Sequence, residues 1–148
     1  MIRTILGFAF LFSLMASGNA SFAQEMHMPA SANSSAAFGQ LKSLAGTWEG
    51  QKSHDVPVTV TYTVVSNGSA VMERLQAAHE PEMITMYTVE GDRLLVTHYC
   101  SMGNQPTMQT DSLSSATGKY NFHFVRVSGN KTPDEGHMAC FPCRTRII

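Results

Sequence analysis

The densest group of side chains able to do chemistry is the stretch THYC, from Thr97 to Cys100. If this stretch is a strand, Thr97 and Tyr99 point to one face of a sheet, and His98 and Cys100 point to the other. Hydrophobic residues precede both pairs, so the pattern does not decide which face is inward. Inside a barrel, His98 or Tyr99 would orient a ligand among apolar neighbours. The alternative is a purely structural pair on a strand.

Two other kinds of chemistry involve the same residues. A catalytic cysteine–histidine pair needs its two groups within hydrogen-bond reach, whereas His98 and Cys100 would lie about 7 Å apart along a strand. As a metal site, these two residues together with His123 would still lack a fourth ligand. We therefore predict no catalytic residue and no metal site. Whether the protein is an enzyme stays open, with a binding role favoured.

A second pair of cysteines lies near the end of the chain, in the stretch CFPC from Cys140 to Cys143. Its spacing is that of thioredoxin-like redox sites. That chemistry needs a helix N-terminus, which lowers the pKa of the first thiol, and only five residues follow Cys143. The histidine that would signal covalent haem is missing after the second cysteine. We predict no cofactor, and a disulfide within the pair or with Cys100 stays open.

The first 23 residues have the features of a signal peptide. One basic residue precedes a short apolar run from Ile5 to Ala16, and small residues follow up to Ala20 and Ala23. The run is too short for a comfortable span of a bilayer, so we expect no stable membrane span after cleavage and a periplasmic or secreted bacterial protein. Residues 24–34, rich in Ala, Ser and Asn, are typical of a flexible linker.

Bulk composition excludes several classes of function. A chain of 148 residues predicts a single domain. Charged residues make up 14% and the net charge is −1, so there is no basic stripe and we expect no nucleic-acid partner. No Gly-rich phosphate loop, nucleophile elbow or HExxH motif is present. Acidic residues such as Glu73 form no pair whose spacing predicts opposite pKa shifts in one cleft, so we expect them on solvated faces.

The hydrophobic period changes once along the chain. Phe38, Leu41 and Leu44 recur at three-residue spacing, which predicts a short helix that Ser34 or Ser35 caps and Gly46 ends. After Gly46 the period is two, with tight turns at Asn67–Gly68 and Gly91–Asp92. No helix is long enough for a βαβ crossover, so we predict an all-β antiparallel meander that curls into a barrel. The predicted strands are 47–53, 58–66, 70–77, 83–90, 93–101, 107–114 and 119–127.

The stretch LKSLAGTWEG, which holds Gly46 and the single tryptophan Trp48, resembles the opening of lipocalin-like (calycin) barrels, including proteins related to nitrobindins. In those barrels the tryptophan plugs the closed end under the helix. The last glycine of their LxGxWxGxG pattern is missing here, because Gln51 and Lys52 follow Gly50. More narrowly, SNGSAVMER, MITMYTVEGDRLLVTHYCSMGNQP and PDEGHM are similar to a family of uncharacterised exported bacterial proteins. This resemblance covers residues 38–138 and implies a lipocalin-like barrel with an N-terminal helix.

The last ten residues depart from that family. Further alternating strands would follow residue 138, whereas residues 139–148 show no period of two and contain a proline and two arginines. We therefore expect an irregular tail, and we hypothesise a shifted or truncated reading frame near Met138. On this hypothesis the barrel domain spans residues 35–138 and is incomplete, so the nitrobindin haem ligand, which would lie in the missing part, has no counterpart here.

The function we predict is binding of a small apolar or amphipathic ligand inside the barrel. The alternatives are a small periplasmic enzyme that uses the strand from Thr97 to Cys100, and a structural envelope protein without a ligand. Methionine thioethers suit an adaptable pocket, and Met72, Met83, Met86 and Met102 are available for it. The candidate ligand-binding residues are Trp48, Tyr62, Met86, His98, Tyr99, Asn104 and His123.

Overall fold

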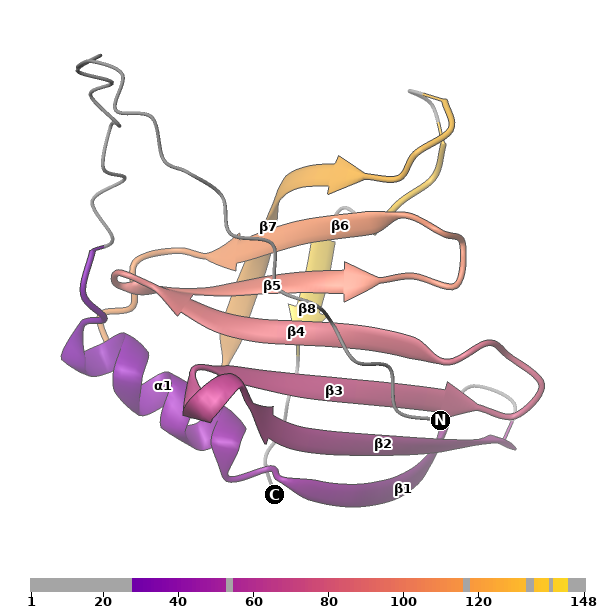
Figure 1. Cartoon of the computed structure of the whole chain (residues 1–148), viewed down its shortest axis with the longest axis horizontal. Coiled ribbons are helices and arrows are strands. Elements are labelled where there is room, and N and C mark those ends of the chain that lie inside the picture. Colours follow the sequence, from indigo (N-terminus) through magenta and orange to yellow (C-terminus); the bar gives the residue numbers. More distant parts are fainter. Residues whose placement is uncertain (1–27, 53–54, 116–117, 133–134, 139, 144–148) are drawn as a thin grey trace, which may run out of the picture.

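The computed structural model describes residues 28–52, 55–115, 118–132, 135–138 and 140–143. One α-helix precedes an eight-stranded sheet in which every strand pairs antiparallel with the next strand along the chain. Figure 1 shows that β7 and β8 turn behind the front strands, so the sheet curls around an interior. The elements are α1 (Ala32–Lys42), β1 (Gly46–Lys52), β2 (Val56–Val65), the 3-10 turn η2 (Ser66–Gly68), β3 (Ala70–Ala77), β4 (Met83–Glu90), β5 (Arg93–Tyr99), β6 (Gln105–Thr110), β7 (Tyr120–Ser128) and β8 (Cys140–Cys143).

The predicted antiparallel meander with one N-terminal helix is confirmed, and β3 and β4 have the predicted bounds. The tight turns are confirmed as well, because Asn67, Gly68 and Gly91 have φ angles of 53°, 82° and 58°. The predicted lipocalin-like barrel is not confirmed. Among the described strands, β1 and β8 are the two edges of the sheet and do not pair with each other, so the sheet is curled but unclosed.

The remaining strands differ from their predicted bounds by up to four residues at an end, as in β6, which was predicted as 107–114 and spans Gln105–Thr110. The start of the helix and the last strand also differ. The helix begins earlier, since its N-cap is Ser31 and not Ser34 or Ser35; the Ser31 hydroxyl accepts a hydrogen bond from the Ser34 amide at 3.1 Å, as an N-cap side chain does. Residues 140–143 were expected in an irregular tail and instead form β8 against β7. A ladder of backbone hydrogen bonds needs no side-chain alternation, and Pro142 is compatible with an edge strand. The predicted signal peptide lies outside the described residues.

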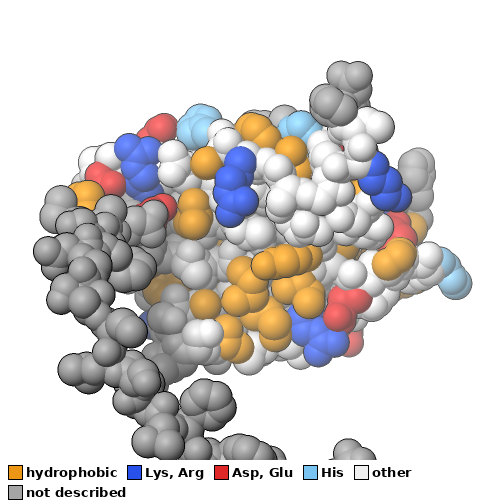
Figure 2. Space-filling view, turned by 45° about the horizontal axis from the view of Figure 1, so that its top comes forward, with side chains coloured by type: hydrophobic (Ala, Val, Ile, Leu, Met, Phe, Trp, Pro, Cys, Tyr) orange, Lys and Arg blue, Asp and Glu red, His pale blue; other side chains and the backbone are white. Residues whose placement is uncertain are grey.

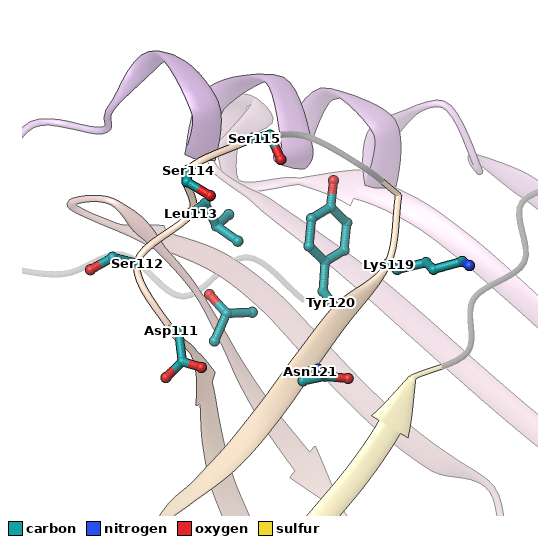
Figure 3. A pocket seen from close by; sticks show the side chains of 9 residues that line it. Asp111, Ser112, Leu113, Ser114, Ser115, Lys119, Tyr120 and Asn121 are labelled. Atoms are coloured by element: carbon teal, nitrogen blue, oxygen red, sulfur yellow. The ribbon is translucent and has the colours of Figure 1, made fainter.

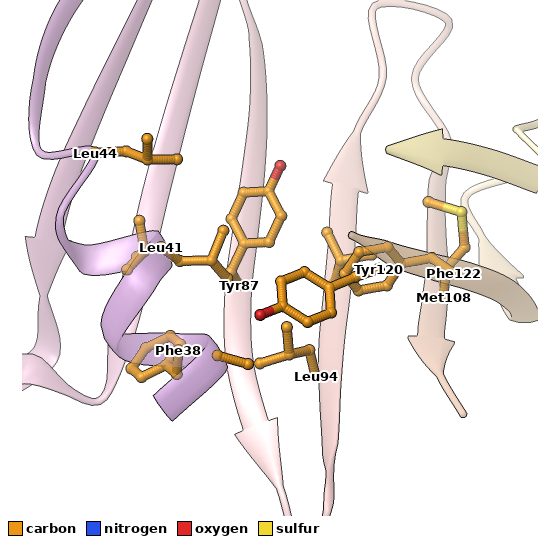
Figure 4. Close-up of a cluster of buried hydrophobic side chains, with 11 residues drawn as sticks. Phe38, Leu41, Leu44, Tyr87, Leu94, Met108, Tyr120 and Phe122 are labelled. Atoms are coloured by element: carbon orange, nitrogen blue, oxygen red, sulfur yellow. The ribbon is translucent and has the colours of Figure 1, made fainter. Parts of the chain in front are cut away.

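The helix lies across one end of the curled sheet, where it covers the core (Figure 4). On α1, Phe38 and Leu41 are buried against strand residues such as Tyr87 and Leu94. Two hydrogen bonds to the Gly91 carbonyl fasten the start of the helix to the β4–β5 turn, from the Ser31 amide at 3.0 Å and the Ser34 hydroxyl at 2.7 Å. We call the end of the sheet that α1 covers the helix end. We call the opposite end, where the turns 78–82 and 100–104 lie, the far end.

Strand alternation and register define two faces of the sheet. The inner face carries the strand residues of the core, Val71, Tyr87, Leu94, Val96, Met108, Tyr120 and Phe122. The outer face carries the intervening residues, among them a threonine ladder in which the Thr47 and Thr61 hydroxyls lie 3.2 Å apart. No helix in the described part of the chain is long and apolar enough to cross a membrane.

Trp48 departs from the position that the lipocalin resemblance implies. Its indole nitrogen donates a hydrogen bond to the Leu44 carbonyl at 2.8 Å, just beyond the end of α1. The side chain therefore lies next to the helix, as expected, but it is 52% exposed and does not belong to the core. The physical reason is that Trp48 lies on β1, an edge strand whose seven residues are all exposed.

Gly129, at the far end, provides a test of the fold. Its φ angle is 81°, and an added Cβ atom would lie 2.7 Å from the Gly103 carbonyl oxygen. We expect Gly129→Ala to lower the free energy of unfolding by roughly 2 kcal/mol or more, because it combines a left-handed backbone with a clash against backbone atoms. Gly39→Ala is the matched control: nothing lies within 4 Å of its added Cβ in α1, so stability should stay equal or rise by about 0.5–1 kcal/mol. Urea unfolding measures both, and equal midpoints for the two variants would contradict this packing.

Candidate functional site

A row of polar side chains crosses the inner face of the sheet. The register pairs Tyr62 on β2 with Glu73 on β3, Glu73 with Thr85 on β4, and Thr85 with His98 on β5. Residues paired in this way share one face, and Thr85 and His98 are both only 7% exposed. We call these four residues the polar row. It lies immediately beyond the sealed core, on the side of the far end.

Hydrogen bonds hold the polar row in place. The Thr85 hydroxyl and the His98 Nδ1 atom lie 2.9 Å apart. The Tyr87 hydroxyl donates to the Glu73 Oε2 atom at 2.7 Å, which ties the row to the core, because Tyr87 is a buried core residue. Glu73 itself is half-buried, and it forms no ion pair with any Lys or Arg in the described part of the chain. The row thus presents a carboxylate with no basic partner toward the interior.

Burial sets the charge of the imidazole in this row. Desolvation lowers the pKa of His98 below its ordinary value of 6.5, and the negative charge of Glu73 raises it by a smaller amount. A lone buried charge is costly in a medium of low polarity, so His98 is neutral at pH 7. A neutral imidazole has one donor and one acceptor nitrogen. With Nδ1 engaged by Thr85, Nε2 is the atom that remains for another partner.

Beyond the polar row, toward the far end, lies a row of apolar side chains on the same face. The register pairs Trp48 with Val60, Val60 with Leu75, and Leu75 with Met83. Val60, Leu75 and Met83 are half-buried, and Trp48 is exposed. We call these four residues the apolar row. The inner face is therefore sealed and apolar at the helix end, polar in the middle, and apolar but accessible beyond.

The candidates predicted from the sequence divide between the two faces. Trp48, Tyr62 and His98 lie on the inner face, and the register brings Tyr62 and His98 into the same polar row. Met86 and Tyr99 lie on the outer face, where the register makes Met86 a neighbour of Met72 and Tyr99 a neighbour of Ile84. Figure 2 shows hydrophobic side chains that gather on this outer face. His123 is also on the outer face, paired with Gln109.

His123 and Asn104 lie apart from the polar row. The exposed His123 ring lies 3.2 Å from the Asp111 carboxylate, and the sheet separates it from His98, so these two histidines cannot share a metal ion. Asn104 is fully buried in the β5–β6 turn and donates to the Gly136 carbonyl at 3.0 Å. It holds the loop that follows β7 against this turn. Cys100, beyond the end of β5, carries a free thiol.

Sequence analysis missed Glu73 and Thr85. Glu73 was expected on a solvated face, and that expectation was wrong, because the residue is half-buried on the inner face. The signal was present in β3: Val71, Glu73 and Leu75 alternate with polar or flexible residues, which places the carboxylate on the apolar side. Thr85 alternates in the same way with Tyr87 on β4.

A separate hollow of about 180 Å³ lies in the connection between β6 and β7 (Figure 3). Leu113 and Tyr120 line it, with Asp111 and Lys119 at its rim. The Tyr120 hydroxyl donates to the Gln40 side chain at 2.7 Å, which joins β7 to α1, and burial raises the pKa of this phenol. Ligand pockets are usually about 300–1,000 Å³, so this hollow is smaller than a typical ligand pocket. We interpret it as part of the packing between β7 and α1 and not as a ligand site.

Comparisons of this chain with models of known protein families, with curated proteins and with solved structures give no match. The function proposed below therefore rests on the chemistry of the inner face.

The lowered pKa of His98 predicts a dependence of stability on pH. Well above pH 6.5 the imidazole is neutral in both folded and unfolded chains, and its contribution to the free energy of unfolding is constant. Below pH 6.5 the unfolded chain binds a proton that the folded chain takes up only at lower pH, so the free energy of unfolding falls until the pH passes the lowered pKa. Urea unfolding at pH 7.5 and pH 5.5 should show this loss, and His98→Gln should reduce it. The control is His123→Gln, an exposed histidine; equal pH dependence in both variants would contradict the assignment.

Proposed function

We propose that this protein binds a small amphipathic molecule on the inner face of its curled sheet, as an exported lipocalin-like protein. The observation that carries the proposal is the adjacency of the polar row and the accessible apolar row. Sites for small molecules combine mostly apolar walls with a few polar groups that fix orientation. A curled antiparallel sheet with a helix across one end supports the lipocalin-like interpretation.

The polar row specifies the chemistry of the polar group on the ligand. Glu73 offers a carboxylate whose Oε2 atom already accepts from Tyr87, so the carboxylate is held in one orientation. A carboxylate accepts hydrogen bonds and attracts positive charge, and His98 is neutral and does not compete for it. The favoured ligand therefore has a protonated amine or another strong hydrogen-bond donor at one end.

The apolar row specifies the other end of the ligand. Trp48, Leu75 and Met83 offer an indole, a branched chain and a thioether on one face. Methionine adapts to irregular shapes, and burial of apolar surface supplies about 25 cal/mol per Å². An alkyl or aryl body laid on this row would place its polar group at Glu73, because the two rows are adjacent along the strands.

Two probes with hydrocarbon tails of the same length, dodecylammonium and dodecanoate, test this proposal. Each is titrated into the protein below its critical micelle concentration while the fluorescence of Trp48 is followed. Trp48 is the only tryptophan of the chain, and its backbone pairs with Val60 at the end of the apolar row, so its fluorescence reports on a ligand that reaches β1. We expect the amine to bind at least about tenfold more tightly than the carboxylate, as a charge-assisted hydrogen bond to Glu73 predicts.

Glu73→Gln should remove this preference, because glutamine keeps an acceptor for Tyr87 but loses the charge. The matched control is Glu49→Gln, which removes an exposed carboxylate from the outer face of β1 and should leave the preference unchanged. Equal binding of the two probes, or equal loss in both variants, would show that net charge and not Glu73 attracts the amine.

A catalytic role for His98 is the second candidate, and the observation that favours it is its 2.9 Å distance to the Thr85 hydroxyl. A hydroxyl within hydrogen-bond reach of an imidazole is the arrangement of an activated nucleophile. On this alternative, Thr85→Val would abolish hydrolysis of a long-chain aryl ester while dodecylammonium binding stays within about twofold. Absence of ester hydrolysis by the unaltered protein would leave the hydrogen bond as a purely structural contact.

A further inference from the structure

Within the described part of the chain, the first strand of the sheet, β1, has an unpaired edge along its whole length. β1 pairs with β2 through seven consecutive residue pairs without a register shift, and no other strand in the described part of the chain pairs with it. All seven residues are exposed. An exposed edge presents a row of free backbone donors and acceptors that can accept a further strand.

Two of the devices that protect an edge, proline and a β-bulge, are missing from β1. The strand contains no proline and no bulge, and its charged residues are Glu49, at its centre, and Lys52, at its end. The opposite edge of the sheet differs in this respect, since β8 is only four residues long and contains Pro142. Short strands and prolines discourage pairing between edges. Of the two described edges, β1 is therefore the one suited to a partner.

We propose that β1 pairs antiparallel with β1 of a second copy of this chain, about a two-fold axis at Gly50. A two-fold interface brings the same surface of both copies together. The inner faces of the two copies lie on the same side of the joined sheet only when an even-numbered residue pairs with an even-numbered one and an odd-numbered residue with an odd-numbered one. In the register centred on Gly50, Gly50 faces its own copy, Glu49 faces Gln51, and Trp48 faces Lys52.

On the inner face, this register gives each indole a partner. Among the described atoms, an added Cβ atom at Gly50 would meet only a Val58 methyl at 3.8 Å, so no side chain separates the two strands at the axis. Lys52 forms an ion pair with Glu80 of its own chain, and its methylene stem can lie along the indole opposite. The 52% exposed Trp48 would thus be covered.

On the outer face, the same register is favoured by charge. It places each Glu49 carboxylate opposite a neutral Gln51. The neighbouring permitted register, centred on Glu49, would place the two Glu49 carboxylates directly opposite each other, and like charges in that position are destabilising. Charge therefore selects the axis at Gly50 over the axis at Glu49.

The test is the concentration dependence of mass, measured by analytical ultracentrifugation on the full chain as the producing cell processes it. We expect a reversible dimer in which the Trp48 emission shifts to shorter wavelength as protein concentration rises. Gln51→Glu should weaken the dimer roughly tenfold, because it creates two like-charge pairs with Glu49 across the axis. The double variant Glu49→Lys with Gln51→Glu should restore or strengthen the dimer, because each pair then has opposite charges.

Thr63→Glu is the matched control, since it adds the same charge on the exposed outer face of β2, beyond the part of β2 that pairs with β1. It should leave the dimer unchanged. A monomer at all concentrations overturns the proposal, and so does a dimer that the double variant fails to restore. Concentration-independent protection of β1 amides from hydrogen exchange would likewise overturn it, because another segment of the same chain would then occupy the edge.

Discussion

The pairing register of β3, β4 and β5 is the constraint on which the rest of the structure depends. A slip of one residue along a strand turns every side chain to the opposite face. The observed register places Val71, Tyr87 and Val96 together under the helix, and the same register aligns Glu73, Thr85 and His98. The same pairing of β3, β4 and β5 therefore produces both the core and the polar row. Gly91, in the turn between β4 and β5, has a left-handed φ angle of 58° and supports the register of these two strands, since turn geometry sets the register of a hairpin.

This arrangement divides the inner face by solvation. At the helix end, Phe38 and Leu41 exclude water from the core, and the hydrogen bonds to Gly91 keep the helix there. A polar group next to such a core is costly unless it is hydrogen-bonded, and the polar row meets this requirement in pairs, Thr85 with His98 and Glu73 with Tyr87. The low polarity that stabilises the core also keeps His98 neutral, and this leaves Glu73 as the charged member of the row.

Local signals made much of the fold predictable from the sequence. Asn67–Gly68 and Gly91 fixed two turns, and alternation fixed the bounds of β3 and β4. The face of β5 was not predictable, because Leu94, Leu95 and Val96 precede both pairs in THYC; only the register with β4 assigns His98 to the interior. The N-cap at Ser31 was missed because several serines suit that position, and the contact with Gly91 that selects it is distant in sequence. β8 was missed because its pairing with β7 needs backbone groups alone.

Trp48 connects the interior of the sheet with its edge. It is the last member of the apolar row and also the largest side chain on the unpaired strand β1. If β1 pairs with a second copy about Gly50, the inner faces of both chains lie side by side, and each Trp48 lies opposite Lys52 of the other copy. Ligand and partner would then cover the same side chain, so binding at Glu73 and pairing of β1 would be thermodynamically linked. A closed barrel would have no such link, because its first strand has no free edge.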